Sequence, residues 1–263
     1  MKNIFRSIKI SLEYFRYKFY LLLNKPYFGI YLAARQGDPS RLYYIDKIIQ
    51  QILPKSDPIS ILEIGSWAGS SAIAWAAALK KYHFGNGKIV CIDAWKSYFD
   101  LQENKENVYL DMNQAAGDDK IFKLFLHNIK ATKNDHIITY LRGQSCDILP
   151  SLTGIKFDII YIDASHLYPD VLSDIKFSKN LLKDPGVLCG DDLELQISEI
   201  DLEFAKKNKT KDYILDPRTK RLYHPGVTLA VGEIFNKVSS WDGFWAMKKN
   251  VAEWELLVLK NES

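Results

Sequence analysis

The 263-residue chain lacks a long apolar run, and it has few cysteines and little net charge. No apolar stretch reaches the ~18 residues that would indicate a membrane-spanning helix. Cys91, Cys146 and Cys189 are odd in number and form no C-x-x-C pair. They therefore predict reduced, buried thiols in a cytoplasmic protein, and neither a disulfide framework nor a zinc site. The net charge of +3 is too small to indicate a nucleic-acid partner.

The N-terminus lacks an uninterrupted apolar core and a small-residue cleavage site, which argues against a signal peptide. Apolar residues instead recur at helical spacing, at Ile4, Ile8, Leu12, Phe15, Phe19 and Leu22, and basic residues lie away from this stripe, at Lys2, Arg6, Lys9 and Arg16. We expect a basic amphipathic extension over residues 1–38. Residues 1–25 would either contact an anionic membrane peripherally or pack on the domain or on a second subunit of a homo-oligomer, and packing is favoured.

Residues 39–263 alternate between strand-like and helix-like segments and predict one α/β domain. The expected strands are 59–64, 88–93, 136–142, 157–163 and 187–190, followed by a hairpin of 244–249 and 254–260. The expected helices are 39–53, 70–80, 119–131, 146–152, 169–182 and 227–238. Five strands joined by helices indicate a parallel sheet, and ligands of such sheets bind at the carboxyl ends of the strands. Residues 96–119 are interpreted as a long polar loop with some helix, of the kind that often forms a lid. Residues 196–226 are also polar and include Pro217 and Pro225.

The most specific segment is ISILEIGSWAGSSAIAWAAAL, residues 59–79. Its pattern is a strand, a glycine turn and a helix, in which Gly65 permits a sharp turn and Gly69 permits close approach of a ligand to the first helical turn. Trp67 stands where a pyrophosphate-binding loop would carry glycine. Glu63 places a carboxylate at the end of the strand, just before the turn. The segment favours S-adenosylmethionine (SAM), which carries a carboxylate and no phosphates, over a dinucleotide. An ordinary strand–helix turn is the alternative.

Polar residues follow the next two strands. Asp93 ends the second strand, where a carboxylate can accept hydrogen bonds from a ribose diol or can cap a turn. Gly143, Gln144 and Ser145 follow the third strand and could meet the edge of an adenine ring.

Acidic residues follow strands four and five, which are neighbours in a sheet ordered 3-2-1-4-5. Asp163, Asp191 and Asp192 would meet there and repel one another, and a hard divalent cation would relieve the repulsion. We therefore expect Mg²⁺, or Mn²⁺ or Ca²⁺, although helix capping is an alternative role. His166 lies above this crevice and could take a proton from a hydroxyl group. The other histidines, His83, His127, His136 and His224, are interpreted as surface or packing residues.

The motifs EIGSWAGSS (63–71), CIDAW (91–95), RGQS (142–145), YIDASHLY (161–168) and GDDLE (190–194) resemble those of class I SAM-dependent methyltransferases. The chain is most similar to the magnesium-dependent O-methyltransferases of the macrolide and aminocoumarin sugar type, which include cephalosporin-hydroxylase-like members. The resemblance covers about residues 40–260. Cys189-Gly190 replaces a β-branched pair, and the basic N-terminal helix lies outside the pattern.

The resemblance implies a Rossmann-like, mostly parallel seven-stranded sheet in the order 3-2-1-4-5-7-6 with helices on both faces. It implies that Asp163, Asp191 and Asp192 bind the metal and that His166, with Asp163, is catalytic. The implied cofactor-binding residues are Glu63, Gly65, Ser66, Trp67, Gly69, Ser70, Ser71, Asp93, Ala94, Trp95, Gly143, Gln144, Ser145 and Asp163.

The sequence thus predicts a SAM- and Mg²⁺-dependent O-methyltransferase that acts on a hydroxyl of a sugar, a polyol or another small-molecule or glycan acceptor. Trp95, Tyr98 and Phe99 would form one wall of the acceptor pocket or simply pack. One alternative is an NAD-type oxidoreductase, against which Trp67 and the acidic set argue. Another is a non-catalytic SAM-fold protein that binds a membrane or a partner through its N-terminal helix, against which the intact acidic set and His166 argue.

Overall fold

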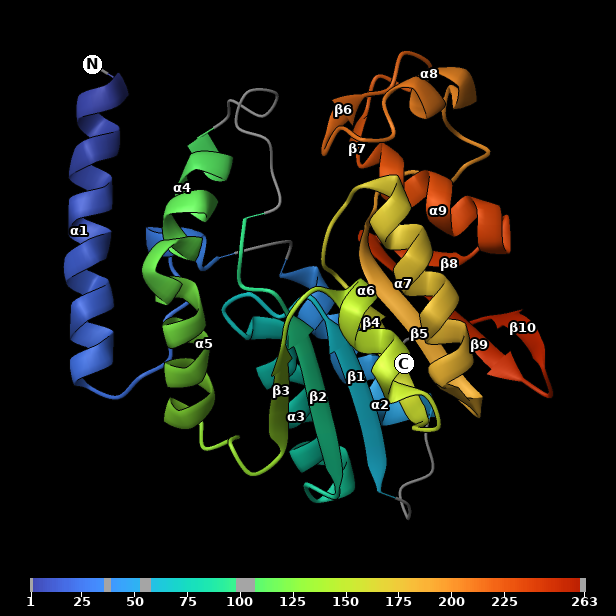
Figure 1. Cartoon of the computed structure of the whole chain (residues 1–263), viewed down its shortest axis with the longest axis horizontal. Coiled ribbons are helices and arrows are strands. Elements are labelled where there is room, and N and C mark those ends of the chain that lie inside the picture. Colours follow the sequence, from blue (N-terminus) through green and yellow to red (C-terminus); the bar gives the residue numbers. More distant parts are fainter. Residues whose placement is uncertain (1, 36–38, 53–57, 98–106, 261–263) are drawn as a thin grey trace.

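A computed structural model describes residues 2–35, 39–52, 58–97 and 107–260. Its centre is a sheet in the order β10-β9-β5-β4-β1-β2-β3, in which β8 also pairs with β9 (Figure 1). The strands are β1 (Ile59–Ile64), β2 (Gly87–Asp93), β3 (Ile138–Arg142), β4 (Phe157–Ile162), β5 (Leu182–Leu193), β8 (Ser239–Trp241), β9 (Gly243–Asn250) and β10 (Glu253–Leu256). The first five strands are parallel, as predicted, and β9 runs antiparallel to β5.

The implied order is confirmed for its first five strands, 3-2-1-4-5. Next to β5 lies β9, the strand expected as the sixth, so the full order 3-2-1-4-5-7-6 holds only when β8, which was not predicted, is counted as the sixth strand and β9 as the seventh. Residues 244–249 were expected to pair with 254–260 in a terminal hairpin, and they do pair through β9 and β10, but the second strand ends at Leu256. β10 is therefore an additional edge strand. β5 is much longer than the predicted 187–190, because it begins at Leu182 and continues through Asp191 and Asp192.

Helices cover both faces of the sheet, because alternate side chains of the central strands point to opposite sides. Ile61 of β1 packs in one core with Trp75 and Phe125, whereas Ile64 packs in the other with Ile175. The first core is covered by α2 (Ser40–Ile52), α3 (Ser70–His83) and α5 (Lys120–Ala131), and the second by η3 (Leu149–Leu152), α7 (Tyr168–Leu181) and α9 (Pro225–Phe235). The near-continuous apolar strands β1 and β4 are typical of a parallel sheet buried on both faces.

The two polar segments, 96–119 and 196–226, contain regular structure, and some helix was expected in the first of them. Within the predicted loop 96–119, α4 (Asn107–Ala116) and η2 (Gly117–Asp119) are helical, whereas residues 98–106 lie outside the described part. Residues 196–226 contain α8 (Leu202–Lys207) and a small sheet of β6 (Ile214–Leu215) and β7 (Leu222–Tyr223). These elements lie above the carboxyl ends of β4 and β5 in Figure 1 and pack through Leu195, Tyr223 and Leu229. The short helix α6 (Ser145–Ile148) begins directly after the Gly143-Gln144 turn.

The N-terminal extension forms α1 (Lys2–Leu22), which runs along the outside of the molecule next to α4 and α5 (Figure 1). A short 3-10 helix, η1 (Tyr31–Ala33), follows it. The side-chain amide of Asn128 on α5 fixes this segment, because its oxygen accepts from the Tyr27 amide at 2.8 Å and its nitrogen donates to the Tyr27 carbonyl at 3.1 Å. Tyr27, Leu32 and Ala34 pack in the first core, the one covered by α2, α3 and α5. The division of the chain after residue 38 stays a prediction.

Two expectations from composition have different outcomes. All three cysteines are free thiols and two are buried, but Cys146 is exposed, so the expectation that it would be buried is wrong. The cause is its position on the single turn of α6, which leaves it outside both cores. As expected from the sequence, no helix within the described ranges is both long enough and apolar enough to cross a membrane.

Candidate functional site

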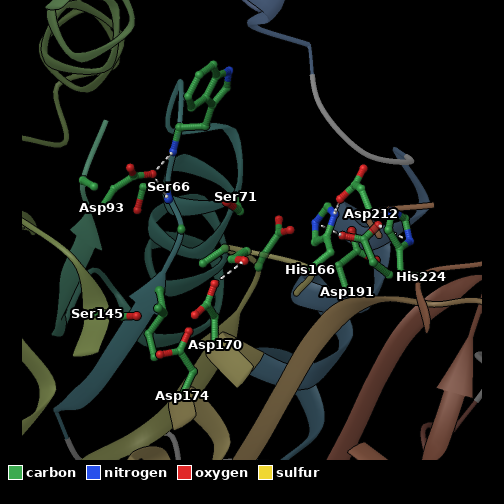
Figure 2. A pocket seen from close by; sticks show the side chains of 18 of the residues that line it. Ser66, Ser71, Asp93, Ser145, His166, Asp170, Asp174, Asp191, Asp212 and His224 are labelled. Atoms are coloured by element: carbon green, nitrogen blue, oxygen red, sulfur yellow. Dashed lines mark hydrogen bonds and ion pairs between the residues drawn. The ribbon is translucent and has the colours of Figure 1, made fainter. Parts of the chain in front are cut away.

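A cavity of about 820 Å³ opens where β1, β2, β4 and β5 end. That volume lies within the ~300–1,000 Å³ range of small-molecule sites. Figure 2 shows its polar side chains in two groups, with Ser66, Asp93 and Ser145 on one side and His166, Asp212 and His224 on the other. We call these the glycine-loop half and the histidine half. Their separation means that two different ligands can be bound next to each other.

Gly65 begins the glycine-loop half and has a φ of 89°, which favours glycine. A Cβ atom at this position would lie 1.9 Å from the backbone oxygen of Asp163. No side chain can be placed there without moving β1 and β4 apart. The sequence prediction that Gly65 makes a sharp turn without a side-chain clash therefore has a physical basis in the neighbouring strand.

Asp93 holds the loop that follows Gly65. Its Oδ2 accepts from the amides of Ser66 and Trp67, both at 2.8 Å, and its Oδ1 accepts from the Trp95 amide at 2.6 Å (Figure 2). An ionised carboxylate offers about four acceptor positions, so about one remains for a ligand hydroxyl. Burial raises the pKa of Asp93, and the three amides oppose that rise. Asp93 therefore orders the loop and keeps limited capacity to bind a ribose.

The cavity lining includes most of the residues predicted to bind the cofactor: Gly65, Ser66, Trp67, Ser70, Ser71, Asp93, Ala94, Gly143, Gln144, Ser145 and Asp163. Glu63, Gly69 and Trp95 do not line it. Glu63 is fully buried beneath the loop, and burial raises its pKa to about 8. Gly69 precedes α3 and lies against Phe125. Trp95 is fully buried and donates its indole N–H to the Trp67 carbonyl at 2.8 Å, so it packs and forms no pocket wall. Tyr98 and Phe99 lie outside the described residues.

Asp174 of α7 is a buried acid that the sequence did not single out. It lines the cavity beside Ser145 in Figure 2, and only 1% of it is exposed. Within the described chain, neither of its carboxylate oxygens has a hydrogen-bond partner. Burial raises its pKa to about 7, which the neighbouring Ser145 opposes only in part.

Arg41 of α2 changes the expected metal site. Its Nη1 lies 2.8 Å from Oδ2 of Asp163 and 3.3 Å from Oδ2 of Asp191. Burial raises the pKa of both carboxyls, and Arg41 opposes that rise. A single guanidinium ion therefore already pairs with two of the three carboxyl groups that were predicted to bind Mg²⁺. The predicted set of Asp163, Asp191 and Asp192 does not converge on a shared point in this arrangement.

His166 is held between two carboxylates in the histidine half. Its Nδ1 lies 2.7 Å from Oδ1 of Asp212, and its Nε2 lies 2.9 Å from Oδ2 of Asp192. Tyr109 of α4 donates its hydroxyl hydrogen to Asp212 at 2.6 Å. Burial alone would lower the pKa of His166, but Asp192 and Asp212 together raise it well above its usual value. The imidazolium form of His166 is therefore favoured while both pairs are intact.

His224 lies beside His166, with ring centroids 4.3 Å apart. Its Nδ1 lies 2.9 Å from Oε1 of Glu194 and 4.0 Å from Oδ1 of Asp192. The interpretation of His224 as a surface or packing residue is wrong. Within the described ranges, His166, Asp192 and His224 form a group whose ligand atoms all lie within 4.8 Å of one another, close enough to share a metal ion.

Sequence reasoning missed Arg41, Asp174, Asp212 and His224. Arg41 precedes the first predicted strand, and Asp212 and His224 lie in the polar segment 196–226, for which no strand or helix was predicted. None has a local motif, because the packing of segments that are far apart in the sequence brings these residues to the cavity. The available signal was that residues 196–226 follow the acidic end of β5, which places them near the crevice.

The sequence was compared with known protein families and with curated proteins. Residues 62–193, just over half of the chain, match the model of a methyltransferase domain. A curated relative, the O-methyltransferase hkm8 of Aspergillus hancockii, is 26% identical over 137 residues, which is 52% of this chain and 44% of that protein. The chain thus spans less than half the length of this relative.

Solved structures share the fold at low identity. A protein described as a putative caffeoyl-CoA O-methyltransferase from Staphylococcus aureus is 14% identical, with a TM-score of 0.51 over 82% of this chain and 85% of that one. CalS11, a calicheamicin methyltransferase, is 13% identical, with a TM-score of 0.51 over 80% of this chain and 78% of that one. The resemblance of the sequence motifs to methyltransferases is confirmed by the match to the family model. The chain belongs to the methyltransferase family.

Proposed function

We propose that this methyltransferase transfers the methyl group of SAM to a hydroxyl of a sugar, a polyol or another small-molecule or glycan acceptor. The observation that carries the proposal is the division of one cavity into a glycine-loop half and a histidine half. The first suits a nucleoside cofactor without phosphates, and the second presents an imidazole where the acceptor would bind. The names of the O-methyltransferase relatives support the choice of oxygen as the methyl acceptor.

His166 acts as the base in this mechanism. Asp212 accepts the Nδ1 proton and so directs Nε2 toward the side where the acceptor binds. Nε2 carries a proton that is paired with Asp192, so His166 can act as a base only after this pair opens and the proton leaves to solvent. The neutral Nε2 then accepts the proton of the acceptor hydroxyl. The deprotonated oxygen then attacks the methyl carbon of SAM in line with the carbon–sulfur bond, which breaks as the electron pair returns to sulfur and S-adenosylhomocysteine leaves. The residues around the crevice orient the acceptor hydroxyl toward the methyl group and exclude water.

A metal ion is a second candidate for the histidine half. Mg²⁺ or Ca²⁺ prefers oxygen ligands, and Arg41 already contacts Asp163 and Asp191, so that set does not fit such an ion as arranged. His166, Asp192 and His224 would instead suit a cation that accepts imidazole nitrogen, such as Fe²⁺ or Zn²⁺, with Mn²⁺ intermediate. A bound ion would lower the pKa of the acceptor hydroxyl, and Nε2 of His166 could not then also act as the base.

Two titrations test the cofactor and the ion. Calorimetry with S-adenosylhomocysteine should show binding with a dissociation constant of about micromolar order, whereas NAD, the control ligand, should show none. Binding of NAD alone would instead support an oxidoreductase. Titration with Co²⁺, followed by its visible absorption, tests the metal site directly. A spectrum that is lost in His224→Ala would support the metal, and no spectrum would support His166 as the base.

The His166→Asn variant tests the base, with His127→Asn as the matched control because His127 lies outside the cavity lining. Methyl transfer from labelled SAM to a panel of sugars and polyols should fall ~10²–10⁴-fold in the first variant and be unchanged in the second. Both variants should bind S-adenosylhomocysteine like the unmodified chain. Equal methyl transfer by His166→Asn would contradict the proposed mechanism.

A further inference from the structure

α1 exposes a continuous apolar stripe. Leu12, Phe15, Phe19 and Leu22 are 65%, 70%, 56% and 82% exposed. At about 100° per residue, the four side chains lie within about 80° of one another around the helix. Large apolar side chains that are this exposed and this closely aligned mark a surface that binds something. We call these four residues the α1 stripe.

The opposite face of α1 already packs on the molecule. Tyr17, Tyr20 and Leu21 lie against the first core, and the rings of Tyr17 and Tyr20 make edge contacts with the ring of Tyr27. The position of α1 at the outer flank beside α4 and α5 agrees with this (Figure 1). The α1 stripe therefore faces away from the domain, and rotating the helix to bury it would remove the contacts with Tyr27.

Basic residues border the α1 stripe on both sides. Lys18 follows one edge and Lys9 follows the other, about 40° and 60° beyond the nearest residue of the stripe. Arg16 begins beside Lys9, but its guanidinium pairs with Glu13 and lies over the Tyr20 ring. All three are exposed. The single acid of the helix, Glu13, points to the opposite face, where it accepts from the Tyr27 hydroxyl at 2.7 Å and from Arg16 at 3.0 Å. The outward surface of α1 is thus apolar at its centre and positive at its borders.

We propose that the α1 stripe docks this protein on an anionic lipid bilayer, with α1 lying in the plane of the membrane interface. The pattern fits a peripheral helix, whose apolar centre enters the interface while flanking cations meet lipid phosphates. Charge argues against a second copy as the occupant. If two copies paired their stripes, the bordering lysines and arginines of one would lie near those of the other, and like charges there oppose pairing.

The test uses the full chain and sedimentation with vesicles of phosphatidylcholine and phosphatidylglycerol in equal parts. The unmodified chain should bind these vesicles and bind pure phosphatidylcholine much more weakly. Phe15→Ser combined with Phe19→Ser should weaken binding at least ~10-fold, from the lost apolar burial. Phe84→Ser is the matched control, because Phe84 is 93% exposed at the end of α3, and it should bind like the unmodified chain.

A second variant separates charge from apolar burial. Lys9→Gln with Lys18→Gln should weaken binding about fivefold for each lysine removed, and added salt should reduce the difference. Far-UV circular dichroism and S-adenosylhomocysteine binding should be the same in all variants, since the substituted side chains are exposed. Equal binding by Phe15→Ser/Phe19→Ser, or equal binding of neutral and anionic vesicles, would overturn the proposal. If the unmodified chain binds no vesicles but forms a dimer without lipid, and if Phe15→Ser/Phe19→Ser dissociates that dimer, the proposal is overturned and a second copy is the occupant of the α1 stripe.

Discussion

The buried carboxyl group of Asp174 gives the sharpest quantitative prediction. In the unfolded chain its pKa returns to an ordinary value of 3.8, whereas burial raises it to about 7 in the folded protein. The folded state therefore binds the proton more tightly. Proton binding to Asp174 therefore stabilises the folded state, and this contribution is complete below pH 3.8 and is lost as the pH rises through about 7. The difference between the two pKa values corresponds to about 4 kcal/mol of unfolding free energy.

Asp174→Asn keeps the shape of the side chain and remains neutral at every pH. We expect this variant to exceed the unmodified chain in unfolding free energy by about 1 kcal/mol at pH 4.5 and by about 4 kcal/mol at pH 8. Urea denaturation followed by circular dichroism at the two pH values measures both differences. Asp135→Asn is the matched control, because the Asp135 side chain is exposed and does not line the cavity. A difference that does not change with pH would refute the reasoning.

Three further predictions concern single contacts. Arg41→Met should lower the unfolding free energy by ~3–5 kcal/mol, because it leaves two buried carboxylates without their cation, and unchanged urea denaturation would contradict this. Asp212→Asn should lower the rate of methyl transfer ~10²–10⁴-fold, because it no longer orients His166; equal loss of S-adenosylhomocysteine affinity would instead indicate a structural role. Asp93→Asn should weaken S-adenosylhomocysteine binding at least ~10-fold, because an amide has one oxygen with which to hold the loop, and unchanged calorimetric affinity would argue against that role.

The parallel core of the fold could be predicted because its signals are local. Each of the first five strands is a short apolar run with a turn or polar segment after it, and parallel strands gather whatever follows them at one edge. That rule placed Asp93, Asp163 and Asp192 in one cavity. The strand β8 was missed, because its three residues, Ser239–Trp241, are too short to show alternation.

The charge balance of the site could not be predicted in the same way. Arg41 is 122 residues from Asp163, and Asp212 is 46 residues from His166. Such contacts are fixed by how helices and loops pack over the sheet, which periodicity does not reveal. For Trp95 the error is reversed, because the sequence placed this residue in the site and the structure places it in the core. It follows Asp93 in a matching motif, but its positive φ and its bond to the Trp67 carbonyl turn the ring into the core.

The contact of Gly65 with the Asp163 carbonyl sets the spacing between the two halves of the cavity. Gly65 begins the loop of the glycine-loop half, and the chain that continues from Asp163 carries His166 in the histidine half. The separation of the two halves is thus fixed where two backbones lie against each other. An alanine at position 65 would push β1 and β4 apart and would move the two halves relative to each other.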